Sequence, residues 1–198
     1  MKIYFHLNVE SFSNCYLVVN EKTKEALIID PCKISKEIID QIENDHYKLS
    51  GVLITHKHQS HTAGLATLKK IYDFNIYAAD AEVCGEKNLL KGDGDIKVAG
   101  LTVSYYSLPG HTADSIVYKI GNAVFTGDVI SAGKIGSSSC SYTHSRLCSG
   151  IKSKLFTMAE SNLVFPGHGP LTSIGAEKLY NTEVGEKLPG NEPDSAGV

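Results

Sequence analysis

Four apolar segments of this chain each end in side chains of the kind that bind metal ions. Imidazole and carboxylate groups are suitable ligands for a divalent metal such as zinc. A fold that gathers the ends of these segments at one edge of a sheet would bring the ligands together, and this requirement restricts the fold strongly. The segments are GVLITHKHQSH with His56, His58 and His61, YYSLPGH with His111, AVFTGD with Asp128, and LVFPGH with His168.

The first of these segments places three histidines within six residues. His56 and His58 are two residues apart, so they would share one face of a strand, and on a loop they could chelate a single ion. His61 lies a turn later, points elsewhere and suits a second ion. A lone histidine is usually an ordinary polar residue. Three of them directly after a buried strand, with ligand types after three later strands, indicate a metal site.

The later ligands follow tight turns. His111 and His168 each follow a Pro-Gly pair, and Asp128 follows Thr126 and Gly127. Such turns can aim the next side chain at the end of a strand. The recurrence of apolar run, turn and ligand strengthens the prediction of a metal site.

Length and composition favour one globular domain. The chain has 198 residues, 42% of them hydrophobic, which is enough for one substantial core. We expect a single domain over residues 1–187 and a flexible tail rich in Pro and Gly over 188–198. The net charge of -3, without long runs of either sign, argues against a nucleic-acid partner.

The sequence also predicts a cytoplasmic protein. No apolar stretch approaches the roughly 20 residues that cross a bilayer, so no membrane association is expected. The start of the chain alternates apolar and polar residues as a strand does, which is unlike a signal peptide. The five cysteines are scattered and form no C-x-x-C pair, so a disulfide framework is not expected.

Hydrophobic periodicity predicts the secondary structure. Three strands open the chain as an antiparallel sheet, and two hairpins turn at Ala99–Gly100 and at Gly121. The serine-rich segment 131–149 has little periodicity and is expected to be a long loop. The other predicted elements are a helix from its N-cap Ser35 to about His46, a strand at 51–54, a helix at 65–72, a strand at 74–79, a helix or turn at 81–90, a helix at 151–160, a strand at 162–165 and a last helix at 174–188.

Taken together, the motifs resemble those of a known family. The set H-x-H-x-(Ser)-H, P-G-H-T, F-T-G-D and F-P-G-H-G-P, with NCYLV and ALIIDP, is similar to the metallo-β-lactamase fold superfamily, and particularly to its small hydroxyacylglutathione hydrolase (glyoxalase II)-like members. The resemblance spans roughly Asn14 to Tyr180. It implies an α/β (α+β) fold, a four-layer αββα sandwich with its metals at one edge of the paired sheets. The two sheet-rich halves flanked by helices agree with this arrangement.

The resemblance also implies a division of the ligands between two metals. Carried over by position, His56, His58 and His111 bind the first metal, His61 and His168 bind the second, and Asp128 bridges both. Asp30 matches an acidic position that supports the site from behind its ligands, because imidazoles bound to a metal need an acceptor that orients them.

Ser60 departs from the family pattern. It stands where these hydrolases carry an aspartate that binds the second metal and contacts the attacking water. A serine hydroxyl is neutral and a poorer ligand for a dication, so we expect one tightly bound zinc and a second that is weak or absent. Iron or manganese are alternative metals. Ser60 and Asp128 are the candidate catalytic positions.

Three functions follow from this pattern. The first is a metal-dependent hydrolase that acts on a thioester or ester, with a small-molecule substrate. The second is a mononuclear iron persulfide dioxygenase that uses His56, His111 and Asp128. The third is an inactive or engineered-inactive homologue. The oligomeric state is left open.

Two further departures bear on the substrate. The segment after Asp128 lacks the Gly-Arg-Thr-Asp stretch frequent in glyoxalase II-like members. Its Cys140, His144 and Cys148 could contact substrate, although a solvated loop is the favoured interpretation. The chain also stops before the helical domain on which full-length glyoxalase II enzymes bind glutathione, so glutathione thioesters are one candidate among several.

Overall fold

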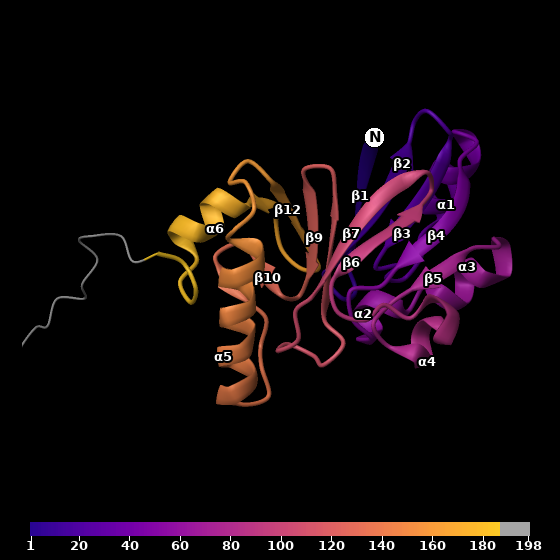
Figure 1. Ribbon diagram of the computed structural model, residues 1–198. Coiled ribbons are helices and arrows are strands. Elements are labelled where there is room, and N and C mark those ends of the chain that lie inside the picture. The colour runs from indigo at the N-terminus through magenta and orange to yellow at the C-terminus, as the bar shows by residue number, and fades with distance from the viewer. Residues whose placement is uncertain (187–198) are drawn as a thin grey trace, which may run out of the picture.

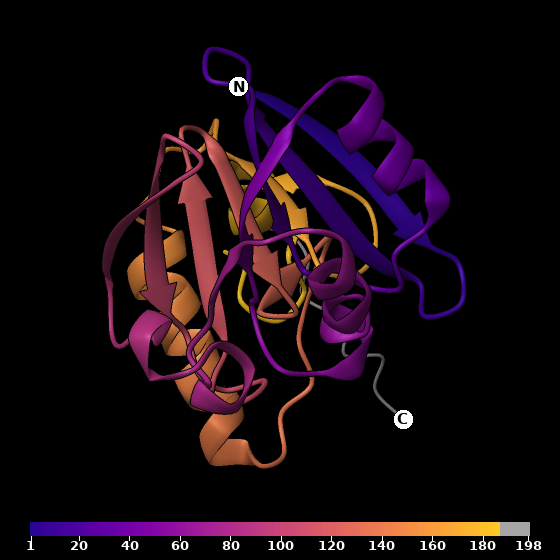
Figure 2. The same cartoon turned by 90° about the vertical axis from the view of Figure 1, so that its right-hand side faces the viewer.

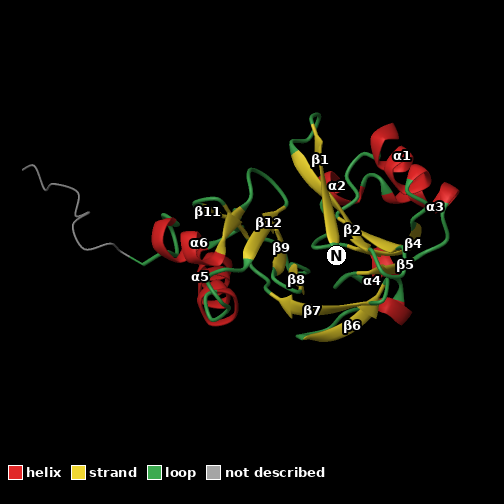
Figure 3. Ribbon diagram, turned by 90° about the horizontal axis from the view of Figure 1, so that it is seen from above, coloured by secondary structure: helices red, strands yellow, loops and turns green. Residues whose placement is uncertain are grey.

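The computed structural model describes residues 1–186, so the predicted tail at 188–198 lies outside the described residues. Two sheets pack face to face, and helices cover their outer faces (Figure 1). Seen from above in Figure 3, α1 and α3 lie beyond one sheet, while α5 and α6 lie beyond the other. This arrangement is the predicted αββα sandwich.

The first sheet has five strands in the order of the chain. β1, β2 and β3 are antiparallel, as predicted, and β4 and β5 continue parallel to β3. Parallel neighbours have their carboxyl ends at the same edge, so β3 and β4 deliver their following residues to one place. The strands are β1 (Lys2–Asn8), β2 (Ser13–Asn20), β3 (Glu25–Ile29), β4 (Lys48–Leu53) and β5 (Asn75–Tyr77).

The second sheet has six strands in the order β13-β12-β9-β8-β7-β6. β7 and β9 both run antiparallel to β8, and β12 runs parallel to β9, so β7, β9 and β12 all end at the same edge. The strands are β6 (Gly94–Val98), β7 (Leu101–Ser107), β8 (Ile116–Ile120), β9 (Ala123–Gly127), β12 (Leu163–Pro166) and β13 (Thr172–Ser173), with the separate hairpin of β10 (Ile130–Ser131) and β11 (Lys134–Ile135).

The helices are short and amphipathic. Ser35 is the N-cap of α1, as predicted. The helical elements are α1 (Lys36–Asn44), α2 (Gln59–Thr62), α3 (Leu65–Ile71), α4 (Ala81–Cys84), a 3₁₀ turn (Glu86–Asn88), α5 (Ser141–Gly150), a π-helical turn (Ile151–Leu155) and α6 (Ile174–Tyr180).

Three apolar layers hold these elements together. One fills the space between the sheets and includes Tyr16, Phe125 and Phe165, whose rings pack 5.0 to 5.4 Å apart. The second lies between the first sheet and the helices α1 and α3, and the third between the second sheet and α5 and α6. Because both faces of each sheet are covered, strands such as β2 are buried along their whole length rather than at alternate residues.

Two buried tyrosines link the sheets through their hydroxyls. Tyr16 of the first sheet donates to the carbonyl of Pro166, 2.7 Å away at the end of β12. Tyr118 of the second sheet donates to the carbonyl of Ile54, 2.9 Å away just beyond β4. Burial raises the pKa of both phenols far above its usual range, so both hydroxyls stay protonated donors. Each bond ends two residues before a predicted ligand, His168 or His56.

The prediction of a long loop over 131–149 was wrong. The chain forms the hairpin of β10 and β11 and then α5, which continues into the π-helical turn; the helix expected to start at residue 151 is this continuation. Leu147, Ile151 and Leu155 recur every four residues and are fully buried in the third layer. Tertiary packing of this stripe outweighs the weak helix propensity of the surrounding Ser, Thr, His and Cys residues.

The last helix is shorter than predicted. It ends at Tyr180 instead of reaching residue 188. The side chain of Asn181 explains the end, because its amide donates to Glu177 while its carbonyl accepts from the backbone N–H groups of Glu183 and Val184. Asn side chains stabilise turns in this way. Among the described residues, none of the helices has the length and apolar character needed to span a lipid bilayer.

Removing the Tyr118 hydroxyl should destabilise the sandwich. Tyr118→Phe leaves the ring packed but withdraws the donor from the buried Ile54 carbonyl, which should lower the free energy of unfolding by about 1–2 kcal/mol. Chemical denaturation measures the change, with Tyr142→Phe as the control because that side chain is 72% exposed. Equal stability of the two variants would contradict a structural role for the bond between the sheets.

Candidate metal centre

Of the eight predicted site residues, all except Ser60 and His61 lie just beyond the end of a strand. Asp30 follows β3, and His56 and His58 follow β4, whereas His61 and Ser60 lie in the short α2 that comes next. His111, Asp128 and His168 follow β7, β9 and β12. The structure therefore brings the four sequence segments together where the two sheets share an edge.

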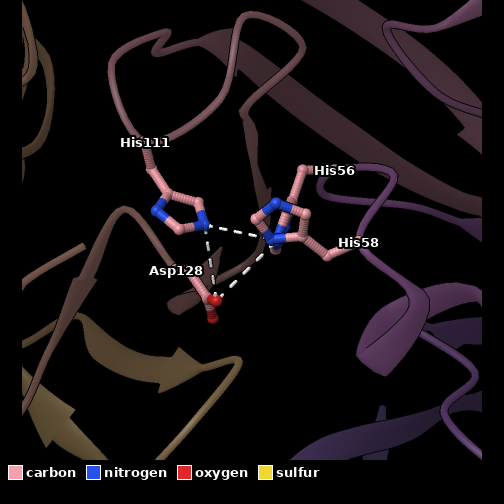
Figure 4. Close-up of side chains that lie close together, drawn as sticks. All are labelled: His56, His58, His111 and Asp128. Carbon is pink, nitrogen blue, oxygen red and sulfur yellow. Dashed lines mark hydrogen bonds and ion pairs between the residues drawn. The ribbon is translucent and has the colours of Figure 1, made fainter. Parts of the chain in front are cut away.

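Four ligand atoms surround one point (Figure 4). The Nε2 of His56 lies 2.8 Å from the Nδ1 of His58, which lies 3.3 Å from the Nε2 of His111. The Oδ2 of Asp128 is 3.7 Å from the nitrogen of His56 and 3.6 Å from that of His111. We call these four residues the first set.

The first set suits a tetrahedral metal. Zinc binds imidazole nitrogen at about 2.0–2.1 Å with tetrahedral geometry, which places neighbouring ligand atoms about 3.3 Å apart. The distances in the first set lie on both sides of this value. His58 is exposed while His111 and Asp128 are half-buried, so the point that they surround is accessible to a small molecule.

Hydrogen bonds behind the first set orient two of its rings. The Nδ1 of His111 donates to the carbonyl of Ser137, 2.8 Å away, which leaves the Nε2 lone pair directed at the set. The Nδ1 of His56 lies 3.1 Å from the hydroxyl of Thr55, and this hydroxyl donates to Asp30. His56 therefore also presents an unprotonated Nε2 to the same point.

Partial loss of hydration favours the neutral forms of both His56, which is buried, and His58, which is exposed. Desolvation is the largest cause that lowers the pKa of His56, to about 3, and it also lowers the pKa of His58, with further lowering from His111. Neutral imidazole is the form that binds a metal. The first set thus offers neutral nitrogens together with one carboxylate.

The other carboxylate oxygen of Asp128 faces a second group of ligands. Its Oδ1 lies 3.4 Å from the Nε2 of His61 and 2.8 Å from the Nδ1 of His168. These three residues form the second set. One carboxylate oxygen faces each set, which is the arrangement of a bridging ligand. Although burial alone would raise the pKa of Asp128, His168 and His61 hold it well below its usual range, so the group is an anion.

His61 is completely buried between two carboxylates. Its Nδ1 donates to Asp30 over 3.0 Å, while its Nε2 has no hydrogen-bond partner. Burial lowers the pKa of His61, but Asp30 and Asp128 outweigh it and raise the pKa to about 10. The pocket around His61 therefore favours a positive charge, which either a proton or a metal ion can provide.

Asp30 organises the residues behind both sets. It accepts from the backbone N–H and the hydroxyl of Thr55, at 2.8 and 2.7 Å, as well as from His61. Its own backbone has a φ of 50°, in the left-handed region that few residues other than glycine adopt. The strain is tolerated because three hydrogen bonds hold the carboxylate in place.

Two glycines allow the loops to approach closely. A Cβ on Gly127 would meet the Thr55 hydroxyl at 2.3 Å, and a Cβ on Gly167 would collide with Asp128 and His61. Each glycine directly precedes a ligand. The Thr-Gly-Asp and Pro-Gly-His turns are therefore needed for space as well as for direction.

Ser60 lies in α2, directly before His61. Its carbonyl accepts from the Ser13 hydroxyl over 2.9 Å. Beside it is a cavity of about 420 Å³. The residues that line this cavity are Asn8, Glu10, Ser11, Lys33, Gln59, Ser60 and Ala63.

Sequence reasoning missed several supporting residues. Asp114 accepts from the backbone N–H of Lys57, 2.8 Å away, and so ties the loop of His56 and His58 to the loop of His111. Asn14 donates to the carbonyls of Pro166 and Gly169 on both sides of His168. The sequence contained a signal for each of these residues, since Asp114 stands three residues after His111 and Asn14 belongs to the NCYLV motif.

The polar side chains after Asp128 belong to α5. Cys140 is its exposed N-cap, and the Sγ of Cys148 lies 3.5 Å from the Nε2 of His144. The first two turns of the helix lie against the turn before His111, where Gly110 packs against Thr143 and Leu147. The segment is thus helical, so the expected loop was wrong, while Cys140 is exposed as expected.

Comparison with known proteins agrees with the fold and the site. Residues 9–182 match the family model of the metallo-beta-lactamase superfamily. The chain therefore belongs to the metallo-beta-lactamase superfamily. This family binds metal ions, and the described residues contain two clusters of histidine and aspartate suited to them.

Individual relatives cover most of the chain. An uncharacterized protein of Treponema pallidum is 32% identical over 87% of this chain and 94% of its own length. The hydroxyacylglutathione hydrolase GloC of Haemophilus influenzae is 29% identical over 88% of this chain and 93% of its own. The crystal structure of ETHE1 from Myxococcus xanthus superposes with a TM-score of 0.82 at 27% identity, covering 93% of this chain and 84% of that one. The predicted fold, the predicted family and the class of metal-dependent hydrolase are confirmed.

Asp114 should control metal affinity by fixing the separation of the two ligand loops. Asp114→Ala removes the acceptor for Lys57 and should raise the zinc dissociation constant about 10-fold, whereas Asp114→Asn keeps an acceptor oxygen and should recover most of the affinity. Competition with a chromophoric chelator measures this, with Asp73→Ala as the control for loss of an exposed carboxylate. Unchanged affinity in Asp114→Ala would refute the positioning role.

Proposed function

We propose that the chain hydrolyses a thioester or ester of a small molecule, with one tightly bound zinc in the first set. The observation that carries this proposal is the ring of four ligand atoms around one accessible point, from His56, His58, His111 and Asp128. The hydroxyacylglutathione hydrolase named among the relatives supports a thioester as the substrate class.

The charge of the first set suits carbonyl chemistry. A divalent metal bound there supplies a Lewis acid and lowers the pKa of water to about 7. Three neutral imidazoles and one carboxylate carry a formal charge of minus one, so the loaded site is net positive. Positive charge at this position stabilises the negative charge that develops on a carbonyl oxygen during attack.

The residues of the first set and their neighbours have different roles in the proposed reaction. His56 and His111 are held by Thr55 and Ser137 so that their Nε2 lone pairs stay directed at the site. Asp128 stays an anion and accepts a hydrogen bond at Oδ1 from His168. His61, with its raised pKa, provides positive charge next to that carboxylate. The cavity beside Ser60 offers room for part of a substrate.

We propose that the second set binds metal weakly. It contains His61, His168 and the shared Asp128, and Ser60 contributes no charge. Without a further anion, a dication in this set must displace the proton that Asp30 and Asp128 hold on His61. One metal per chain is therefore the expected resting state.

The position of His58 favours the hydrolase over the persulfide dioxygenase. A mononuclear iron centre with two histidines and one carboxylate keeps its other positions open. Here the Nδ1 of His58 lies 2.8 and 3.3 Å from the other two histidine nitrogens and fills a fourth position. Oxygen uptake with glutathione persulfide distinguishes the dioxygenase, and a protein without either activity would support the inactive homologue.

His111→Ala should abolish hydrolysis because it removes one of the four ligands of the first set. We expect turnover of a thioester panel to fall by at least about 100-fold, together with a loss of bound zinc measured by mass spectrometry. His144→Ala is the matched control, since it removes an imidazole from α5 nearby. Thioesterase activity that survives in His111→Ala would remove the proposed role of His111.

Ser60→Asp should strengthen the second set, because a carboxylate offsets metal charge that a hydroxyl cannot. Zinc per chain should rise from about one toward two, and thioester turnover should increase. Gln59→Glu is the control, because it adds the same charge at the neighbouring exposed position. If Ser60→Asp behaves like the control in both stoichiometry and rate, Ser60 does not belong to the second set.

A further inference from the structure

The two main sheets have four edge strands, and three of them are protected against pairing with another chain. β5 has three residues and β13 has two, which are too short to pair well. β6 has five residues, but Asp95 and Lys97 are exposed along it. Short length and charged side chains are the usual protections of an edge strand.

β1 has neither protection. It is seven residues long, contains no proline and pairs only with β2 among the described strands. In Figure 2 it forms the indigo border of its sheet. Phe5 and Leu7 lie on one face and are 47 and 49% exposed, and Val9, in the turn that follows, is 70% exposed. Phe5 also packs on Tyr16 at the margin of the layer between the sheets, with ring centroids 5.8 Å apart.

We propose that β1 pairs antiparallel with β1 of a second copy of this chain, across a twofold axis at Phe5. This pairing would join the two five-stranded sheets into one continuous sheet. It would cover the exposed apolar face of β1 and satisfy the backbone groups along its free edge.

The sequence of β1 is complementary to itself in this register. Phe5 is the middle residue of the strand, so it lies opposite Phe5 of the second copy, and Ile3 lies opposite Leu7. Apolar cross-strand pairs of this kind stabilise antiparallel sheets. Because Ile3, Phe5 and Leu7 share one face, all the apolar side chains meet on the same side of the joined sheet.

The charges at the ends of the strand also favour a second copy. Lys2, the one charged residue of β1, lies opposite the neutral Asn8 of the other copy, so no like charges face each other. Glu10 follows Asn8 by two residues and lies within reach of that lysine on the diagonal. Glu10 pairs with Lys33 in the single chain, and both of these side chains are exposed enough for Glu10 to accept a second partner. Because of the twofold symmetry, the same attraction between Lys2 and Glu10 occurs at both ends of the paired strands.

The pairing would bring the second copy close to the proposed substrate cavity. Asn8 and Glu10 line the cavity beside Ser60, and both stand at the end of the paired strands. Lys2 of the second copy would therefore add a positive charge at the margin of this cavity. The interface does not depend on the proposed hydrolysis, since it follows from β1 alone.

Sedimentation velocity of the full chain over micromolar concentrations tests the proposal. The wild type should sediment with twice the mass of one chain, and Leu7→Lys should raise the dimer dissociation constant at least about tenfold, because it places a charge inside the apolar face. Leu179→Lys, at a leucine of α6 that is 41% exposed, is the matched control and should stay dimeric. A monomeric wild type, or a dimer that persists in Leu7→Lys, would overturn the proposal.

Cross-linking tests the register and does not depend on the folding of Leu7→Lys. Side chains directly opposite each other in an antiparallel pair are close enough for a disulfide. In a Cys140→Ser background, which removes the exposed native thiol, Phe5→Cys should give a reducible covalent dimer after mild oxidation. Lys24→Cys in the same background should not. Failure of Phe5→Cys to cross-link at dimer-forming concentrations would overturn the twofold axis at Phe5.

Discussion

The carboxylate of Asp128 is the group on which the rest of the site depends. Each of its oxygens faces a different set of imidazoles, so a single residue at the end of β9 fixes the relative position of ligands from both sheets. The anion and the buried Asp30 concentrate negative charge around His61 and His56. A positive charge among these residues, from a proton or a metal ion, would offset this negative charge. A metal bound here would therefore help to hold the loops in place as well as supply chemistry.

The two sets differ in the groups that determine the tautomer and the charge of their histidines. In the first set, backbone and hydroxyl acceptors fix the tautomers of His111 and His56, and burial keeps His56 neutral. In the second set, two carboxylates raise the pKa of His61 against the effect of burial and so favour its charged form. Ser60, which carries no charge, is consistent with the weaker metal affinity that we propose for the second set. The surroundings of the two sets are therefore asymmetric, because His56 and His58 of the first set are neutral whereas a positive charge is favoured on His61 of the second.

Much of this could be predicted from the sequence, because the informative residues lie at strand ends. Apolar runs that stop at His56, His111, Asp128 and His168 identify both the strands and the edge at which they meet. Contacts between distant residues could not be predicted in the same way. The helix α5 depends on burial of Leu147, Ile151 and Leu155 against the second sheet, and Asp114 acts through a backbone N–H that no local pattern indicates.

The two tyrosines between the sheets have a consequence for how this molecule opens. Tyr16 and Tyr118 each cross the interface and hold a carbonyl that precedes a ligand of the opposite sheet. Separation of the sheets would therefore release the ends of β4 and β12 in the same event. Exchange of backbone amide hydrogens in these two segments should then share one opening free energy, and loss of the ion should accompany that opening rather than precede it. The site and the sandwich form one cooperative unit.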